Sequence, residues 1–160
     1  MADPNVTKLL LKSYLAAIRN SSGANTWRNF YAVDNGTERD VLGDGDMSCA
    51  YFVSSITTMF GLSKTIHMTV DSTIKDLEEY GWTKIDTPRE GAVLVWEPQD
   101  FGEAGSFIHI GFYVGNEKAI STSLRTHSPT EYDWLFRDHP PEGKTERRVL
   151  QILWSNKLTS

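Results

Sequence analysis

The chain has very little cysteine and no long apolar segment. Cys49 is the only cysteine among its 160 residues, so no internal disulfide can form, and nothing marks or excludes an oxidising compartment. The longest apolar stretches are far shorter than the roughly 20 residues that a spanning helix needs, so we expect no membrane span. Repeats and low-complexity tracts are absent as well. Length and composition therefore predict one globular domain, residues 1–160.

Positive charge and metal-binding motifs are also scarce. The formal net charge is −5, which argues against a large phosphate-binding surface and so against nucleic acid as a partner. No H-E-x-x-H motif is present, and one cysteine cannot build a thiolate zinc cage. We therefore expect no metal site and interpret three of the histidines as solvated loop residues. They are His67, His127 and His139.

The N-terminal segment lacks the basic start and the long apolar core of a Sec signal peptide. Its apolar residues recur near helical spacing, so we expect an N-terminal helix within residues 1–20 that begins near Pro4. The location stays open, because both a cytoplasmic protein and one released by a non-Sec route fit this pattern. The oligomeric state stays open too.

The order of turn signals and apolar runs predicts an α+β fold. After the N-terminal helix, further helical segments are expected over 44–61 and 70–81. An antiparallel sheet is expected over 91–155. An order in which the helices come first and the strands follow is typical of a fold with helices packed against one antiparallel sheet. The expected strand segments are 82–85, 92–96, 107–114, 118–123 and 148–154.

Cys49 stands where the second of these helices is expected to begin. The turn-rich stretch 43–48 precedes it, with Asp46 or Ser48 as the N-cap, and an apolar run follows as far as Gly61. A thiol in the first turn of a helix meets free backbone N–H groups and the positive end of the dipole. This position predicts a lowered thiol pKa and a nucleophilic thiolate. The alternative is a small apolar residue buried in the core.

A histidine further along the chain could complete a Cys–His pair. His109 lies in the run 107–114, which precedes a turn at Gly115 and Asn116 and a second apolar run, a β-hairpin pattern. An isolated histidine in a strand is more often a hydrogen-bonded core residue. Combined with a cysteine at a helix start, it is the arrangement expected of a thiol hydrolase. There the imidazole takes the thiol proton and later delivers it to the leaving amine.

Three segments resemble motifs of the NlpC/P60 cysteine peptidases. Residues 48–53 stand where the family has D-C-S-G-F/L-V, and residues 88–96 resemble its P-x-x-G-D-L-V-x-F strand. Residues 109–116 are similar to its H-V-G-I-Y-x-G-N/D strand. The similarity covers about residues 27–123, within the usual error of such boundaries.

This resemblance implies a papain-like α+β fold, with N-terminal helices on a four- to six-stranded antiparallel sheet. It carries the nucleophile role to Cys49 and the general-base role to His109, and it assigns Tyr31 and Ser48 to substrate binding. Family members cleave cell-wall peptides, so the implied partner is a peptide or a peptidoglycan fragment. No cofactor is implied.

Several positions depart from the family pattern. Ser48 and Ala50 replace the aspartate and serine that flank the nucleophile, and Ala92 replaces the aspartate of the G-D strand. The family's third polar residue, which orients the imidazole, usually lies twelve positions after the histidine and is His, Asn or Gln. Here that position is Ser121.

The register of the hairpin decides which hydroxyl faces His109. A three-residue loop over 115–117 puts Ser121 and Ser123 on the face of the histidine. A two-residue loop puts Thr122 there, because a one-residue slip exchanges the two faces of a strand. We predict Ser121, whose hydroxyl can accept a hydrogen bond from the imidazole and so fix its tautomer and orientation.

Two classes of function remain open. The first is a cysteine hydrolase that cleaves a peptide or isopeptide amide through a Cys49 thioester, with His109 as general base. The resemblance places this amide in bacterial peptidoglycan stem peptides. The second is a non-catalytic binding module on the same scaffold, in which the altered flanks reflect lost chemistry. Acyl transfer through the same thioester shares every sequence feature with hydrolysis.

Overall fold

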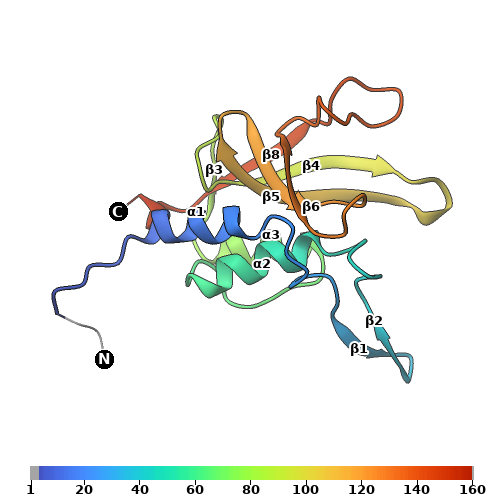
Figure 1. Ribbon diagram of the computed structural model, residues 1–160, viewed down its shortest axis with the longest axis horizontal. Helices are drawn as coiled ribbons and strands as arrows, with labels where there is room; N and C mark the ends of the chain where they lie inside the picture. The colour runs from blue at the N-terminus through green and yellow to red at the C-terminus, as the bar shows by residue number, and fades with distance from the viewer. Residues whose placement is uncertain (1–3, 160) are drawn as a thin grey trace.

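The described residues, 4–159 of the computed structural model, form three α-helices, two short 3-10 helices and two antiparallel sheets. This is an α+β fold, as the sequence predicts (Figure 1). The helices are α1 (Leu10–Asn20), α2 (Cys49–Met59), α3 (Val70–Glu79), η1 (Gly102–Ala104) and η2 (Asn156–Leu158). The strands are β1 (Tyr31–Asp34), β2 (Thr37–Asp40), β3 (Thr83–Lys84), β4 (Val93–Asp100), β5 (Ser106–Gly115), β6 (Lys118–Thr122), β7 (Pro129–Asp133) and β8 (Val149–Trp154).

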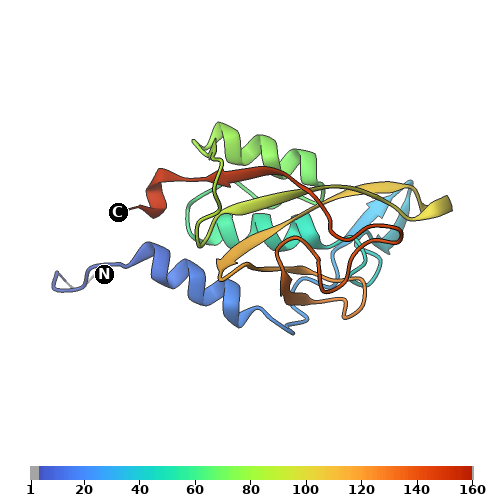
Figure 2. The ribbon, with the colours of Figure 1, turned by 90° about the horizontal axis from the view of Figure 1, so that it is seen from above.

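Six of the strands form the main sheet, in the order β3-β8-β4-β5-β6-β7, and each neighbouring pair is antiparallel. The other two, β1 and β2, form a separate hairpin that projects from the lower right of Figure 1. Figure 2 shows α2 between α1 and α3. Helix α2, which begins at Cys49, is thus the central helix of the layer that covers the sheet.

The two faces of the main sheet are covered by different parts of the chain. On one face, the Phe112 ring of β5 packs edge-on against Phe52 of α2, with ring centroids 5.4 Å apart. Side chains alternate along a strand, so Trp96 and His109, which are paired across β4 and β5, lie on the other face. The connector from β7 to β8 covers that second face, and its Phe136 packs against Trp96. His109 therefore lies under the connector.

Helix α1 begins later than expected. It starts at Leu10 rather than near Pro4, and residues 1–3 of the expected segment lie outside the described residues. Val6 and Leu9 are 67% and 60% exposed, so they supply no apolar packing, and packing is what stabilises most helices. Burial begins within the helix, where the Tyr14 hydroxyl donates a 2.9 Å hydrogen bond to the Gly91 carbonyl oxygen.

The other two helices begin and end close to the expected positions. Helix α2 occupies the apolar part of the segment 44–61 and ends before Gly61, whose φ of +69° stops it. Thr69 caps α3 by accepting a hydrogen bond from the Ser72 N–H. Residues 44–48 form turns instead of helix, so the helical structure starts at the cysteine itself.

Three strands were not expected from the sequence. Strands β1 and β2 are joined by Asn35 and Gly36, which both have positive φ, as a tight hairpin turn requires. Strand β7, at the edge of the main sheet, pairs with β6 and carries Tyr132. The missed β7 matters for the site, because Tyr132 lies beside His109.

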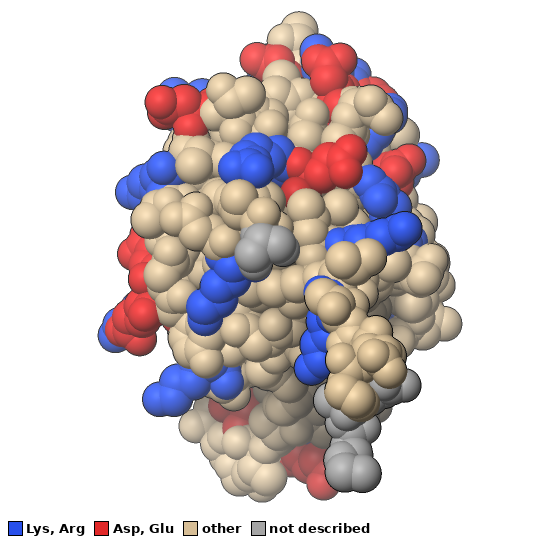
Figure 3. Space-filling model, turned by 90° about the vertical axis from the view of Figure 1, so that its left-hand side faces the viewer, with Lys and Arg blue, Asp and Glu red and all other residues tan. Residues whose placement is uncertain are grey.

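The surface shows no dominance of one charge at the end of the molecule drawn in Figure 3, where Lys and Arg lie among Asp and Glu. Within residues 4–159, no helix is both long and apolar enough to cross a bilayer.

Candidate active site

A network of turns places Cys49 at the start of α2. The loop before it turns sharply, with positive φ at Gly43, Asp44 and Gly45. The Ser48 hydroxyl donates to the Gly45 carbonyl oxygen at 3.0 Å. Ser48 thus occupies the N-cap position but makes no side-chain cap bond to the helix. The loop fixes where the helix, and hence Cys49, begins.

The thiol of Cys49 contacts the backbone of β5. The N–H of Ile110 is hydrogen-bonded to the sulfur and lowers its pKa, as do the N–H groups of Ala50 and Cys49 itself. Burial is the larger effect, however, and it raises the pKa of the thiol above its ordinary value. The lowered pKa expected from the helix start is therefore wrong for this structure. The loss of hydration destabilises the thiolate more than the hydrogen bonds from the backbone N–H groups stabilise it.

This burial leads to a prediction for the thiol. Alkylation of Cys49 by iodoacetamide should be slow at pH 6 and should rise about tenfold per pH unit toward alkaline pH, because only the thiolate reacts. The measurement is the second-order rate from pH 5 to 10, with the chain unfolded in urea as the reference. A fast, pH-independent rate between pH 5 and 7 would show a preformed thiolate and contradict the raised pKa.

His109 is held by two hydroxyl groups on the second face of the sheet. Its Nε2 atom is hydrogen-bonded to Ser121 Oγ of β6 and lies 3.2 Å from the hydroxyl oxygen of Tyr132 on β7. The Trp96 ring lies against the imidazole, with ring centroids 5.3 Å apart. Ser121 and Tyr132 are buried. The imidazole is therefore fixed through one nitrogen and one ring face.

The predicted partner of His109, Ser121, is confirmed. Phe112 pairs with Ile120, which is the register that a three-residue loop gives. The turn itself has only two residues, Asn116 and Glu117, both with positive φ, and an irregularity between Tyr113 and Gly115 supplies the extra residue. A bulge and a two-residue turn thus give the same register as the predicted loop.

One arrangement of the Ser121 hydroxyl leaves a base at His109. With its proton donated to the Thr122 carbonyl oxygen, 3.3 Å away, or to Tyr132, the Ser121 oxygen can accept a proton from His109 Nε2. The other nitrogen, Nδ1, then carries a free lone pair, and it makes no hydrogen bond within residues 4–159. A base with its proton on Nε2 can accept a second proton only at Nδ1.

Burial keeps the imidazole neutral. Burial, together with the smaller effect of the positive charge of Arg147, lowers the pKa of His109 from 6.5 to about 3. Cys49 and His109 are therefore a neutral thiol and a neutral imidazole at physiological pH. They do not form a resting ion pair.

The expected hydrogen bond between the two groups is not formed. In the described part of the chain, Cys49 and His109 share no hydrogen bond, although the thiol is bound to the N–H of Ile110, the next residue after the histidine. Helix α2 packs on one face of the sheet, whereas the imidazole lies on the other face. The two sites still share a neighbour, because the charge of Cys49 acts on Tyr132, whose hydroxyl binds His109 Nε2. A proton transfer from the sulfur to Nδ1 requires a movement that brings the two side chains together.

Gly111 makes room for the contact between Ser121 and His109. A Cβ at this position would lie 2.5 Å from the Ser121 Cβ and 2.9 Å from the Ile120 carbonyl oxygen. Gly111 has no positive φ, so space is the constraint, not backbone conformation. The H-x-G pattern therefore has a local steric explanation.

Replacing Gly111 by alanine should destabilise the protein by about 1–3 kcal/mol, the usual cost of overpacking, and should displace Ser121 from the imidazole. Urea unfolding measures the first effect. The double variant Gly111→Ala/Ser121→Gly removes the closest clash and should recover part of the loss. If Gly111→Ala were as stable as the unaltered protein, the steric explanation would be wrong.

Sequence reasoning missed three residues of this site. Tyr132 is hydrogen-bonded to Ser121, and burial raises its pKa, so its phenol stays protonated. Phe136 packs on Tyr132 with ring centroids 4.4 Å apart and on His109 at 6.0 Å. Arg147 is buried beside Phe136, 5.7 Å from its ring centroid. All three come from β7 and the connector, where no regular pattern marks them.

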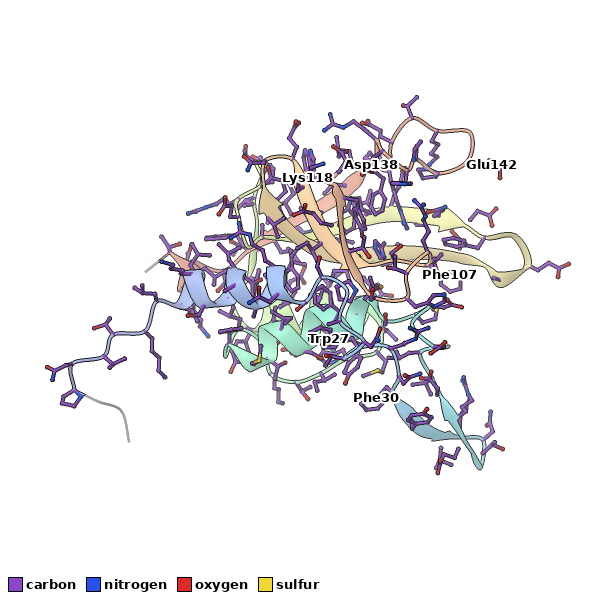
Figure 4. The ribbon with its side chains drawn as sticks, viewed as in Figure 1. Trp27, Phe30, Phe107, Lys118, Asp138 and Glu142 are labelled. Carbon is purple, nitrogen blue, oxygen red and sulfur yellow. The ribbon has the colours of Figure 1, made fainter. Side chains whose placement is uncertain are left out.

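The residues assigned to substrate binding lie elsewhere or are already engaged. Tyr31 is 66% exposed and lies in the projecting β1–β2 hairpin. Figure 4 labels its neighbour Phe30 at the base of that hairpin. The structure does not place Tyr31 in the cluster around His109 and Ser121. Ser48 is buried and its hydroxyl is bound to the Gly45 carbonyl oxygen, so its visible role is to shape the loop.

The remaining histidines have individual partners. His67 binds Asp76, with its Nε2 2.7 Å from Oδ2, and His127 Nδ1 lies 2.8 Å from the Asp44 carbonyl oxygen. Over residues 4–159, no group of three or more His, Cys, Asp or Glu side chains is arranged to hold a metal ion.

A comparison of the sequence with protein-family models and a comparison with curated proteins each found no match. A proposal of function therefore rests on the geometry of the site and on the motif resemblance.

Proposed function

We propose that this protein is a cysteine hydrolase with a papain-like fold of NlpC/P60 type, which cleaves a peptide or isopeptide amide. The observation that carries the proposal is the fixed imidazole of His109. Ser121 and Tyr132 bind its Nε2, while Nδ1 is left free, and the adjacent residue Ile110 binds the Cys49 sulfur. A general base needs a nitrogen with a free lone pair, and Nδ1 of His109 meets that requirement.

The geometry supports a general-base mechanism. Cys49 transfers its proton to His109 Nδ1 as the sulfur attacks the amide carbonyl carbon, and the backbone N–H of Cys49 binds the oxyanion. The imidazolium, still bound to Ser121 through Nε2–H, then protonates the leaving amine. Water, deprotonated by Nδ1, attacks the thioester carbonyl carbon and releases the acid, which returns the thiol and neutral imidazole.

The substrate class follows from the motif resemblance, since the family cleaves bacterial cell-wall peptides. Amides of peptidoglycan stem peptides are therefore the proposed substrates. Acyl transfer to an amine in place of water would use the same thioester and the same residues. The product, a free acid or a new amide, distinguishes these two reactions.

A non-catalytic binding module on the same scaffold is favoured by three observations about Cys49. The Cys49 pKa is raised by burial, and no hydrogen bond links the sulfur to His109 in the described residues. The two hollows described on the surface, one along α1 and one around Glu97 and Arg148, are not lined by Cys49. In this alternative the cysteine is only a core residue.

Digestion of purified peptidoglycan and of soluble muropeptides, read by mass spectrometry, decides between these functions. Hydrolysis predicts loss of one amide between stem residues with the unaltered protein and none with Cys49→Ala. His139→Gln, which changes an exposed histidine, is the matched control and should cleave normally. Cleavage that persists in Cys49→Ala would refute the thiol mechanism. Binding of the fragments without any cleavage would support the module.

A further inference from the structure

Arg147 is a buried cation that ties two strands together beside the site. It is only 5% exposed. Its Nε atom donates to the Glu97 carbonyl oxygen at 2.9 Å, and its Nη2 atom donates to the Phe107 carbonyl oxygen at 3.0 Å. Phe107 begins the part of β5 that leads to His109 (Figure 4). The guanidinium is thus fixed just beyond the Trp96–His109 pair.

This cation has no carboxylate partner within residues 4–159. The carboxylate whose charge acts on Arg147, that of Glu97, forms its ion pairs with two surface cations instead. Lys144 Nζ lies 2.9 Å from Oε1 and Arg148 Nε lies 3.7 Å from Oε2, whereas Arg147 reaches only the Glu97 backbone. Burial of a charge without a counter-ion is costly, and it lowers the pKa of Arg147.

Part of the guanidinium remains available. The two backbone hydrogen bonds use Nε and Nη2. The third nitrogen, Nη1, makes neither of these bonds. In the described chain, the fully enclosed polar side-chain atoms without a partner are Ser55 Oγ, Trp134 Nε1 and Gln151 Oε1. Nη1 is not among them, so it is not fully enclosed. Nη1 is therefore the donor that can still bind a ligand.

The charge of Arg147 acts on the site residues. The guanidinium lies over the Phe136 ring, and the same ring packs against His109 and Tyr132. Its charge is felt by Cys49 as well as by His109. A fixed cation close to a nucleophile, with free donors and no counter-ion, matches the requirements for binding a carboxylate.

We propose that Arg147 binds a carboxylate of the substrate, so that the acyl compounds attacked by Cys49 carry a negative charge close to the scissile carbonyl. This inference rests on the proposed function, because it takes Cys49 to be the nucleophile. It adds a specificity residue and a chemical class of substrate. Acyl groups that lack the carboxylate are poor substrates.

Two alkylating reagents of nearly equal size test this charge preference without any substrate. Iodoacetate carries a carboxylate where iodoacetamide carries a neutral amide. The second-order rates of both with Cys49 are measured in the folded protein and in urea. Their ratio, iodoacetate over iodoacetamide, cancels the thiolate fraction. It should be about tenfold higher in the folded protein, which corresponds to an attraction of about 1.4 kcal/mol.

Two arginine variants test whether Arg147 causes the higher rate ratio. Arg147→Gln should return the ratio to its value in urea while iodoacetamide still reacts, and Arg148→Gln, the adjacent exposed arginine, should leave the ratio unchanged. If Arg147→Gln does not fold, competition in the unaltered protein replaces it. At constant ionic strength, acetate should then slow iodoacetate but not iodoacetamide.

The outcomes separate this proposal from the proposed function. Suppose that iodoacetamide modifies folded Cys49. If the rate ratio then equals its value in urea, or stays high in Arg147→Gln, the carboxylate site is refuted but Cys49 remains a reactive nucleophile. In the acetate experiment, equal rates with and without acetate refute the site. If neither reagent modifies folded Cys49 even at alkaline pH, the nucleophile itself is refuted, and the carboxylate site with it.

Discussion

Replacing His109 by glutamine should lower the rate of amide cleavage by about 10²- to 10⁴-fold, the usual contribution of a positioned general base. The glutamine amide can still donate to Ser121 in place of Nε2–H, but nothing in it can take the thiol proton. The measurement is the rate of fragment release from muropeptides.

His139→Gln controls for the loss of a histidine and should cleave at the unaltered rate. A His109→Gln variant that keeps most of its activity would show that the base is another group. Tyr132 would not be that group, because its raised pKa keeps the phenol protonated.

The same substitution should make the protein more resistant to acid. The pKa of His109 is about 3 in the folded protein and about 6.5 in the unfolded chain. Between these values the unfolded state binds the proton and the folded state does not, so this group costs stability as the pH falls below 6.5. Above pH 6.5 its contribution is constant.

His109→Gln removes this penalty. Relative to the unaltered protein, its free energy of unfolding should increase by about 1.4 kcal/mol per pH unit below 6.5, to a total of a few kcal/mol near pH 3. Urea unfolding at a series of pH values measures the difference. His139→Gln should give no such gain because that side chain is exposed. Parallel pH profiles for His109→Gln and the unaltered protein would mean that the pKa of His109 is not lowered in the folded state.

The position of helix α2 and the partner of His109 could both be predicted from sequence. Turn signals on either side of an apolar run locate α2, because capping and glycine act locally. The choice of Ser121 over Thr122 depended on the loop length. The structure has a shorter turn than expected, but the bulge near Gly115 adds one residue, so the register is the one that the three-residue loop predicts.

Other features could not be predicted because they arise from long-range packing. Burial reverses the direction of the Cys49 pKa shift, and α2 is packed against β5, a strand far from the helix in sequence. Tyr132 reaches the site through the pairing of β7 with β6, and Arg147 reaches it through the connector that covers the sheet. The β1–β2 hairpin did have a local signal, since Asn35-Gly36 is a strong indicator of a tight turn.

The central claim is that Cys49 carries the acyl group during cleavage. It is tested most directly by acid-quenching the protein during digestion of muropeptides and mapping the acylated residue by mass spectrometry. The account predicts a substrate-derived acyl group on Cys49 that hydroxylamine releases, as it does from a thioester, and that disappears when substrate is exhausted. Continued cleavage with Cys49 unmodified at every time point, and at an equal rate in Cys49→Ala, would contradict it.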